Sequence, residues 1–398
     1  MVYDVTQSPY NAVGDGATDD RAAIQSAIDD AETNGGGVVY FPQGTYLLDS
    51  THPTVTGVAL LIDNDNVLLQ GFMKKLSILK LGEDLNISVV NFENCDNCGI
   101  EKLEIDGQRT LQTANSHGIR TGGSTNGLTI KDMFIHDVSS YGIGLQHGTL
   151  RDCLIDNVLI DSTGADGIDV KNMNDNNANN RMVNVTVKRA GRRSDLTGQA
   201  SVDLRGPWNC TNIVILDFED GATTCCQSGI RFRPGEANDT NGIGGHYSSL
   251  TNFYIEAGNT STETVGVHIN AYQVAVAGGV VLNTKTGVLV NQQECTISSV
   301  IAKGCNNGFM VEDSGEVSNG DRVMFSGCIA RGNADSGFKI FTDECVLDGI
   351  AARGNTHGIN LRTGSSKTVI LGVSSSNSGN NLNVQSGGIT YKAEELYT

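Results

Sequence analysis

Asp166-Gly-Ile-Asp-Val-Lys171 is one copy of a short motif that recurs between residues 117 and 362. Each copy has a glycine (once replaced by Ser201), an apolar residue, a variable residue and a second apolar residue, which is the polar Thr121 in the first copy. The copies are His117-Gly-Ile-Arg, Tyr141-Gly-Ile-Gly-Leu, Asp166-Gly-Ile-Asp-Val, Ala200-Ser-Val-Asp-Leu, Ser228-Gly-Ile-Arg-Phe, Val265-Gly-Val-His-Ile, Thr286-Gly-Val-Leu-Val, Asn307-Gly-Phe-Met-Val, Ser336-Gly-Phe-Lys-Ile and His357-Gly-Ile-Asn-Leu. Successive glycines lie 21 to 37 residues apart, a spacing typical of the stacked coils of a solenoid. The short, alternating copies indicate strands rather than helices.

A second short strand can be aligned in several coils. Its copies are Met133-Phe-Ile, Val158-Leu-Ile, Val300-Ile-Ala, Cys328-Ile-Ala and Ile350-Ala-Ala. Two or three strands per coil, with turns between them, are typical of a parallel β-helix, in which inward side chains stack every ~4.8 Å. The 49 glycines and 5 prolines suit an all-β chain with many tight turns.

The N-terminal segment predicts one amphipathic helix followed by a buried strand at 38–41. Thr18 is the expected N-cap, and Gly35 is expected to end the helix. The apolar stripe consists of Ile24, Ala27, Ile28 and Ala31. Since the end of a solenoid exposes strand edges and core, we expect this helix to cap it. The predicted organisation is therefore an N-terminal cap over residues 1–50 and a parallel β-helix over 51–398.

The same segment carries a resemblance to a known superfamily. Gly14-Asp-Gly-Ala-Thr-Asp-Asp20, Ile24-Gln-Ser-Ala-Ile28 and Gly35-Gly-Gly-Val-Val-Tyr-Phe-Pro-Gln-Gly-Thr-Tyr46 resemble the opening of pectate-lyase-superfamily proteins. That superfamily includes phage tailspikes and depolymerases, polygalacturonase-like hydrolases and mannuronan C-5 epimerases, and residues 57–109 also resemble the first coils of the epimerase modules. The resemblance implies a right-handed parallel β-helix and a polysaccharide substrate. It does not distinguish between the reactions, because all these enzymes share the motif.

Strand alternation places the residues one and three after each glycine in the core, and those two and four after it on the outer face. Asp169 and Asp203 therefore occupy equivalent outward positions on adjacent coils, roughly 5 Å apart at Cβ. Asp166 lies at the corner of the same coil as Asp169. Three carboxylates this close cannot all ionise easily, so at least one pKa should rise. Two carboxyl groups with different pKa values suit glycoside hydrolysis, in which one acts as the acid and the other as the base or nucleophile. The reaction can retain or invert the configuration at the anomeric carbon.

Basic residues surround these carboxylates in the predicted coils. The candidate substrate-binding residues are Lys171, Arg205, Arg231, Arg233 and His268. They would suit an anionic sugar, which makes the coils of about 117–270 the predicted active face. The long spacings within 167–201 and 229–266 predict protruding loops, which usually wall a cleft or make contacts. The alternative is an ordinary solvated ladder of paired charges.

Two families can be compared motif by motif. Ala165-Asp-Gly-Ile-Asp169 is similar to the Asn-Thr-Asp-Gly-Ile-Asp motif of polygalacturonases, which would make Asp166 a catalytic acid, although their double aspartate and Gly-His-Gly motifs are absent. Mannuronan epimerases carry Tyr-Gly-Phe-Asp-Pro-His on one coil and Asp-Gly-Phe on the next. Here Tyr141 and Asp166 match, Gly144 and Gln146 replace the first Asp and the His, and His147 lies one residue out of register.

Three functions follow as hypotheses. The first is hydrolysis of an extracellular, acidic polysaccharide by Asp166, Asp169 and Asp203, with no required cofactor. The second is a lyase or C5-uronate epimerase in which Tyr141 or His147 abstracts a proton, with calcium as an optional ligand between Asp169 and Asp203. The third is a non-catalytic glycan-binding spike protein.

Composition limits the partners and the location. The net charge of −18 argues against nucleic acid and anionic membranes as main partners, and no apolar run is long enough to span a bilayer. The opening Met-Val-Tyr-Asp-Val lacks the features of a signal peptide, which leaves an extracellular or virion-associated protein, as a monomer or homotrimer, as the expectation. The pair Cys95 and Cys98 is a weak zinc signal, and we predict no metal ligands.

Overall fold

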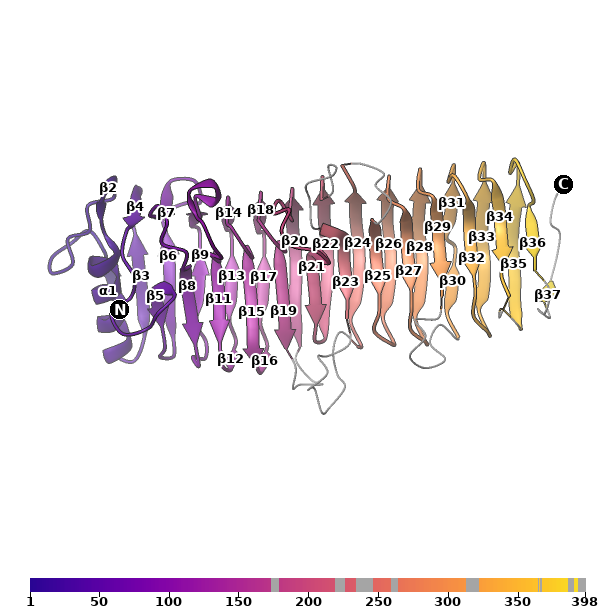
Figure 1. Cartoon of the computed structure of the whole chain (residues 1–398). Helices are drawn as coiled ribbons and strands as arrows, with labels where there is room; N and C mark the ends of the chain where they lie inside the picture. Colours follow the sequence, from indigo (N-terminus) through magenta and orange to yellow (C-terminus); the bar gives the residue numbers. More distant parts are fainter. Residues whose placement is uncertain are drawn as a thin grey trace.

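The chain folds into a long stack of coils that runs from the N-terminal residues at one tip to residues 382–385 and 390–392 near the other (Figure 1). The computed structural model describes residues 1–172, 179–218, 226–233, 246–258, 264–312, 322–363, 365, 367–385 and 390–392. Neighbouring strands in both large sheets pair in parallel, as β19 (Ile168–Asn172) does with β21 (Gln199–Arg205). The predicted all-β, right-handed parallel β-helix is confirmed.

One sheet has 13 strands, and it holds every copy of the glycine motif. In order along the stack, its strands are β5 (Val58–Ile62), β8 (Ser88–Glu93), β11 (Ile119–Gly122), β15 (Ile143–Gly148), β19, β21, β23 (Cys226–Phe232), β25 (Val265–Ile269), β27 (Thr286–Val290), β29 (Asn307–Val311), β32 (Ser336–Ile340), β34 (His357–Leu361) and β36 (Leu382–Val384). The ten predicted strands are β11 to β34 in unbroken succession, in the predicted register.

The other large sheet has 22 strands and carries the second predicted strand of each coil. Its strands are β1 (Val2–Asp4), β2 (Asp15–Asp19), β3 (Gly37–Phe41), β4 (Gly44–Leu48), β6 (Val67–Gly71), β7 (Ser77–Leu81), β9 (Gly99–Glu101), β10 (Glu104–Asp106), β13 (Thr129–Lys131), β14 (Phe134–His136), β17 (Leu154–Asp156), β18 (Leu159–Asp161), β20 (Asn180–Lys188), β22 (Trp208–Leu216), β24 (Ser249–Glu256), β26 (Ala275–Leu282), β28 (Thr296–Lys303), β30 (Met324–Ser326), β31 (Ile329–Arg331), β33 (Val346–Arg353), β35 (Thr368–Ser375) and β37 (Thr390–Lys392). Two further strands, β12 (Thr125–Asn126) and β16 (Leu150–Arg151), pair with each other, and residues Arg109–Leu111 form a 3₁₀ turn.

Apolar side chains fill the space between the sheets, in rows that follow the stack. The inward positions predicted from the motif, such as Ile168, Val170 and Val202, are fully buried. Phe309 and Phe338, on adjacent strands, stack with ring centroids 4.7 Å apart. Each coil therefore buries its apolar residues against the coils above and below it, which explains why the motif repeats.

The motif glycines are explained by close contact between coils. A Cβ atom at Gly142, Gly229 or Gly266 would lie 2.7 Å from the carbonyl oxygen of the next motif glycine. At Gly266 it would also overlap the side chain of Val281. A side chain at these positions would force neighbouring coils apart.

We expect Gly266→Ala to destabilise the fold by about 1–3 kcal/mol, the usual effect of overpacking a close contact. The thermal midpoint should fall for this variant. It should stay unchanged for Thr296→Ala, which alters an exposed residue of β28. Equal thermal midpoints for the two variants would show that the coils can move apart at Gly266 without loss of stability.

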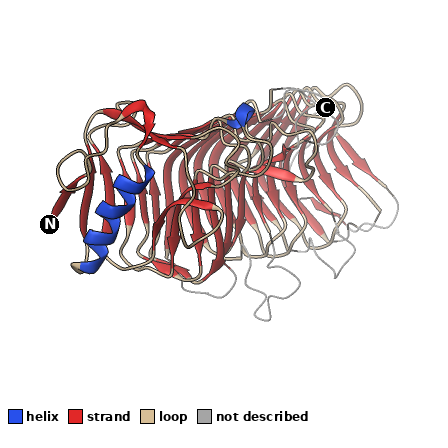
Figure 2. Ribbon diagram, turned by 60° about the vertical axis from the view of Figure 1, so that its left-hand side comes forward, coloured by secondary structure: helices blue, strands red, loops and turns tan. Residues whose placement is uncertain are grey.

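The predicted N-terminal helix is α1 (Arg21–Thr33), beside the first strands of the stack (Figure 2). Its predicted apolar stripe is buried and packs on β3 and β5. The predicted N-cap is wrong. Asp20 occupies that position, while Thr18 belongs to β2, where its backbone N–H and hydroxyl donate to Asp15. Within the described residues, no helix has the length and apolarity needed to cross a membrane.

Candidate active site

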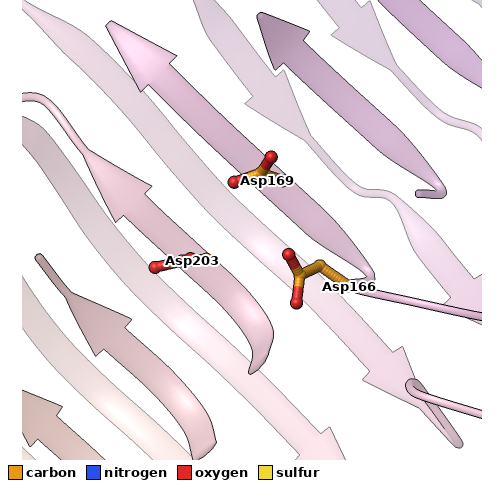
Figure 3. Close-up of side chains that lie close together, drawn as sticks. All are labelled: Asp166, Asp169 and Asp203. Carbon is orange, nitrogen blue, oxygen red and sulfur yellow. The ribbon is translucent and has the colours of Figure 1, made fainter. Parts of the chain in front are cut away.

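Three aspartates meet on the outer face of the 13-stranded sheet. Asp169 and Asp203 are directly paired residues of β19 and β21, and Asp166 lies two residues before β19 (Figure 3). Each carboxyl group offers one oxygen that lies within 4.8 Å of the other two. Asp166 is 3% exposed and the other two are 1% exposed. The predicted cluster therefore exists, and it is buried rather than part of a solvated ladder of charges.

Arginines surround Asp203. Arg231 binds it through two hydrogen bonds, from Nε to Oδ1 at 3.2 Å and from Nη2 to Oδ2 at 2.8 Å. Arg233 Nη1 donates to Oδ2 at 3.1 Å, and Arg205 Nη2 lies 3.6 Å from the same oxygen. Burial alone would raise the pKa of Asp203, but these guanidinium groups, Arg231 above all, hold the pKa below its usual value. Asp203 is therefore ionised at neutral pH.

Asp169 has weaker partners. Gln146 Nε2 donates to its Oδ2 at 2.6 Å, and Lys171 Nζ lies 3.5 Å from the same oxygen. Its Oδ1 is buried and has no hydrogen-bond partner among the described residues, and Arg205 Nη1 lies 3.9 Å from it. Burial and the charge of Asp203 raise the pKa of Asp169. Asp169 therefore has a buried oxygen that could accept a new partner.

Asp166 lies in the least favourable place for a charge. The backbone N–H of Ala200 donates to its Oδ1 at 2.5 Å, but no described cation forms an ion pair with it. Burial, followed by the charges of Asp169 and Asp203, raises the pKa of Asp166 well above its usual value. Asp166 therefore favours its protonated form more strongly than an ordinary aspartate does, and it lies beside the ionised Asp203.

Among the described residues, the charges around the cluster leave an excess of positive charge. In this part of the chain, four cations from Lys171, Arg205, Arg231 and Arg233 face three carboxyl groups. With Asp166 protonated, the cations outnumber the anions by two, and with all three aspartates ionised they still outnumber them by one. Such a site attracts an anionic group.

The tyrosine of the epimerase-like motif is near the cluster but poorly suited to act as a base. Tyr141 stacks on His117 with ring centroids 5.0 Å apart. Burial, with the charges of Asp169 and Asp166, raises the pKa of the Tyr141 hydroxyl. Burial also lowers the pKa of His117 to about 4, so His117 is neutral at pH 7.

The structure describes the side chain of only one of the two histidines predicted to belong to the site. His147 lies in β15 at an irregularity where the register with β19 shifts between Leu145 and Gly148, and its side chain is outside the described residues. His268 pairs with Arg231 in the sheet register and hydrogen-bonds through Nε2 to Asn291 Oδ1 at 2.9 Å. Burial lowers the pKa of His268 to about 4, so it can contribute a hydrogen bond to a substrate but no charge at pH 7.

Calcium fits these residues poorly. The three carboxyl groups are close enough to share one ion. However, both oxygens of Asp203 already accept hydrogen bonds from arginines, and Asp166 favours its protonated form, which leaves Asp169 Oδ1 as the open oxygen. Calcium prefers six to eight oxygen ligands and would meet four fixed cations here. We derive no catalytic step from calcium.

We therefore expect EDTA to leave the thermal midpoint of the protein unchanged. We also expect millimolar calcium to leave the thermal midpoint unchanged, because a ligand that binds only the folded state raises that midpoint. Magnesium at equal concentration controls for ionic strength. A calcium-specific rise in the midpoint would contradict the poor fit.

A cleft of about 270 Å³ continues along the same face, toward the N-terminus. Its lining includes Asn91, Glu93 and Arg120, together with Gln146 from the aspartate cluster. None of these residues is among the site residues predicted from the sequence. The strand of Asn91 and Glu93 has no motif glycine, but its alternation of Val90, Asn91 and Phe92 was a signal that could have extended the motif by one coil.

Comparison with known proteins agrees with the fold and with the sequence resemblance. Mannuronan C5-epimerase AlgE1 of Azotobacter vinelandii is 34% identical over 170 residues, which cover 40% of this chain and 12% of that protein. Alginate lyase 7 of the same organism is 33% identical over 179 residues, covering 42% of this chain and 20% of that protein. The chain thus matches a small part of the length of either relative.

Among solved structures, a tailspike protein of E. coli bacteriophage HK620 in complex with a pentasaccharide aligns with a TM-score of 0.60. The two are 13% identical, and the alignment covers 92% of this chain and 70% of that one. This likeness concerns the fold. Residues 5–310 match the family model described as rhamnogalacturonase A/epimerase, pectate lyase-like. Because that match covers most of the sequence, the chain belongs to the rhamnogalacturonase A/epimerase, pectate lyase-like family.

Proposed function

We propose that this protein is a carbohydrate-active enzyme that cleaves glycosidic bonds of an acidic polysaccharide at Asp166, Asp169 and Asp203. The observation that carries the proposal is the pairing of a carboxyl group whose pKa is raised, Asp166, with a carboxylate that has an open oxygen, Asp169. Glycoside hydrolysis needs these two unlike groups. The excess of positive charge supports an acidic sugar.

In the proposed reaction, Asp166 donates its proton to the glycosidic oxygen. The bond between that oxygen and the anomeric carbon breaks, its electron pair goes to the leaving oxygen, and Asp169 Oδ1 bonds to the anomeric carbon. Water then hydrolyses this intermediate, with Asp166 as the base. The oxygen separations within 4.8 Å are closer to the roughly 5 Å of retaining enzymes than to the 6.5–9.5 Å of inverting ones.

The remaining charged residues position the substrate in this proposal. Asp203 stays ionised and keeps Arg231 and Arg233 in place, while Lys171 and Arg205 face both Asp169 and an anionic group of the sugar. Because all three aspartates are at most 3% exposed, the side chains that cover them must move aside when the sugar enters.

A panel of acidic polysaccharides, followed by two assays at once, tests the proposal. Hydrolysis should release new reducing ends without absorbance from an unsaturated uronide. A lyase would produce both signals. Binding without new reducing ends at any enzyme concentration, and unaffected by Asp169→Asn, would identify a non-catalytic glycan-binding protein instead.

The second candidate function is β-elimination or C5 epimerisation of uronates. The relatives AlgE1 and alginate lyase 7 favour it, as do Tyr141 and Asp166 at their positions in the epimerase-like motif. The raised pKa of Tyr141 weighs against it as the base. A change in uronate composition of an uncleaved polymer would identify the epimerase. Location outside the cell or on a virion, and a monomeric or homotrimeric state, stay predictions.

A further inference from the structure

The cleft beside the aspartate cluster has the features of a built polar site. Asn91 is 4% exposed, and its Nδ2 donates to Glu93 Oε2 at 2.9 Å. Its Oδ1 is buried and has no hydrogen-bond partner among the described residues. An orphaned buried oxygen is costly unless a ligand or water satisfies it.

The backbone leaves room for Glu93. A Cβ atom at Gly122, the residue paired with Glu93 on the adjacent strand, would overlap the Glu93 carboxylate. The missing side chain at Gly122 therefore allows this carboxylate to lie over the strand and line the cleft. Val58, on the neighbouring strand β5, adds an apolar side chain to the lining.

The cleft and the cluster belong to one row of the sheet. Asn91, Arg120, Gly144 and Asp169 are paired in turn on β8, β11, β15 and β19. Three strand spacings separate Asn91 from Asp169, about 14 Å at ~4.8 Å each. Gln146 lines the cleft and donates to Asp169, so it connects the two. A glycan that crosses the strands along this row would meet both.

The two places differ in charge. The cluster has an excess of cations, whereas the cleft has one carboxylate, Glu93, and one guanidinium, Arg120, together with two amide side chains. Acceptors such as Glu93 and Asn91 Oδ1 match the donors of sugar hydroxyl groups, and the balanced charges of Glu93 and Arg120 give a sugar carboxylate no excess of cations to bind. The charges thus favour an acidic sugar unit at the aspartate cluster and an uncharged one in the cleft.

We propose that this cleft is a second sugar-binding subsite, which takes an uncharged, hydroxyl-bearing unit of the glycan whose acidic unit lies at the aspartate cluster. The inference rests on the proposed function for the identity of the ligand as a glycan, but it concerns binding rather than turnover.

The test measures binding by calorimetry in the Asp166→Asn background, so that no turnover is needed. The probes are two hexasaccharides of equal length, one composed only of uronates and one in which uronates alternate with a neutral hexose. The alternating probe should bind more tightly. Glu93→Gln should weaken its binding about tenfold, the effect of one lost charged hydrogen bond, and should strengthen binding of the all-uronate probe. Gly122→Ala, which displaces Glu93, should also remove the preference.

Glu294→Gln is the matched control, because Glu294 is exposed and pairs with Arg322 far along the stack. It should leave both affinities unchanged. Equal affinity of the background protein for both probes, no binding of either, or an unchanged ratio in Glu93→Gln would overturn the subsite. If the wild-type protein turns over no polysaccharide, the proposed function fails. The ratio of the affinities for the two probes still tests whether the subsite exists.

Discussion

Replacing Asp166 with Asn should lower kcat by a factor on the order of 10² to 10⁴, the contribution of a positioned general acid. Asn has the shape of Asp and can still accept the hydrogen bond from the backbone N–H of Ala200, so the fold should be retained. It has no acidic proton to give to the leaving oxygen. The measurement is the rate of reducing-end release at saturating substrate.

The same variant should be more stable than the wild-type protein at pH 7. The pKa of Asp166 is raised in the folded state, so folding above the ordinary Asp pKa of about 3.9 requires uptake of a proton. That cost appears as the pH rises through the unfolded pKa and grows until the folded pKa is reached. Asn has no such cost, so the gain in the thermal midpoint should be present at pH 7 and vanish at pH 3.

The control for this prediction is Asp195→Asn, since Asp195 is an exposed carboxylate paired with Arg193 outside the cluster. It should keep wild-type activity. If Asp166→Asn retains full activity, Asp166 is not the acid. If it loses activity together with stability at pH 7, the carboxylate has a structural role that the raised pKa does not explain.

Much of the site could be predicted because each side chain of a strand can point only to one of two faces of the sheet. Once the glycine of each motif defines the register, alternation places Asp169 and Asp203 on the same face, and the next-coil pairing places them side by side. The burial of the inward residues follows from the same alternation. The sequence therefore predicted which carboxylates meet, although not how strongly they are buried.

The parts that could not be predicted depend on contacts between distant coils. The irregularity after Leu145 shifts the register with β19, and Gln146 reaches the carboxylate of Asp169. The cleft depends on β8, where Val89 occupies the position of the motif glycine and Val90 pairs with Ile119. It also depends on the position of Glu93 over Gly122. Thr18 was the predicted N-cap, but its backbone N–H donates to Asp15 in a local turn instead. Neither a bulge nor a competing turn follows from period-two alternation.

The second large effect is expected for Arg231→Met, which should destabilise the fold by about 3 kcal/mol at pH 7. Arg231 forms two hydrogen bonds with Asp203, and its side chain is 13% exposed. Removal of one partner of a buried ion pair leaves an uncompensated charge and typically costs about 3–5 kcal/mol. We take the lower end of that range because Arg233 and Arg205 still face the same carboxylate.

The dependence on pH separates charge from packing. The pKa of Asp203 is lowered in the folded state, so its ionised form contributes stability that is present above the unfolded pKa of about 3.9 and is lost as the pH falls through the folded pKa. The difference between Arg231→Met and the wild-type protein should therefore be full at pH 7 and shrink below pH 4. Solenoid coils can open separately, so hydrogen exchange of β21 and β23 should accompany the thermal midpoint.

Arg189→Met is the matched comparison, since Arg189 also binds an aspartate through two hydrogen bonds, to Asp161, but with a side chain that is 51% exposed. An exposed pair contributes about 0–1 kcal/mol, so this variant should change the midpoint little. If both variants lose the same stability at pH 7, burial adds nothing to the Arg231–Asp203 pair. If the loss of stability in Arg231→Met persists at pH 3, it comes from the packing of the aliphatic part of the arginine side chain. Asp203 would then not depend on Arg231 to stay ionised beside Asp166 and Asp169.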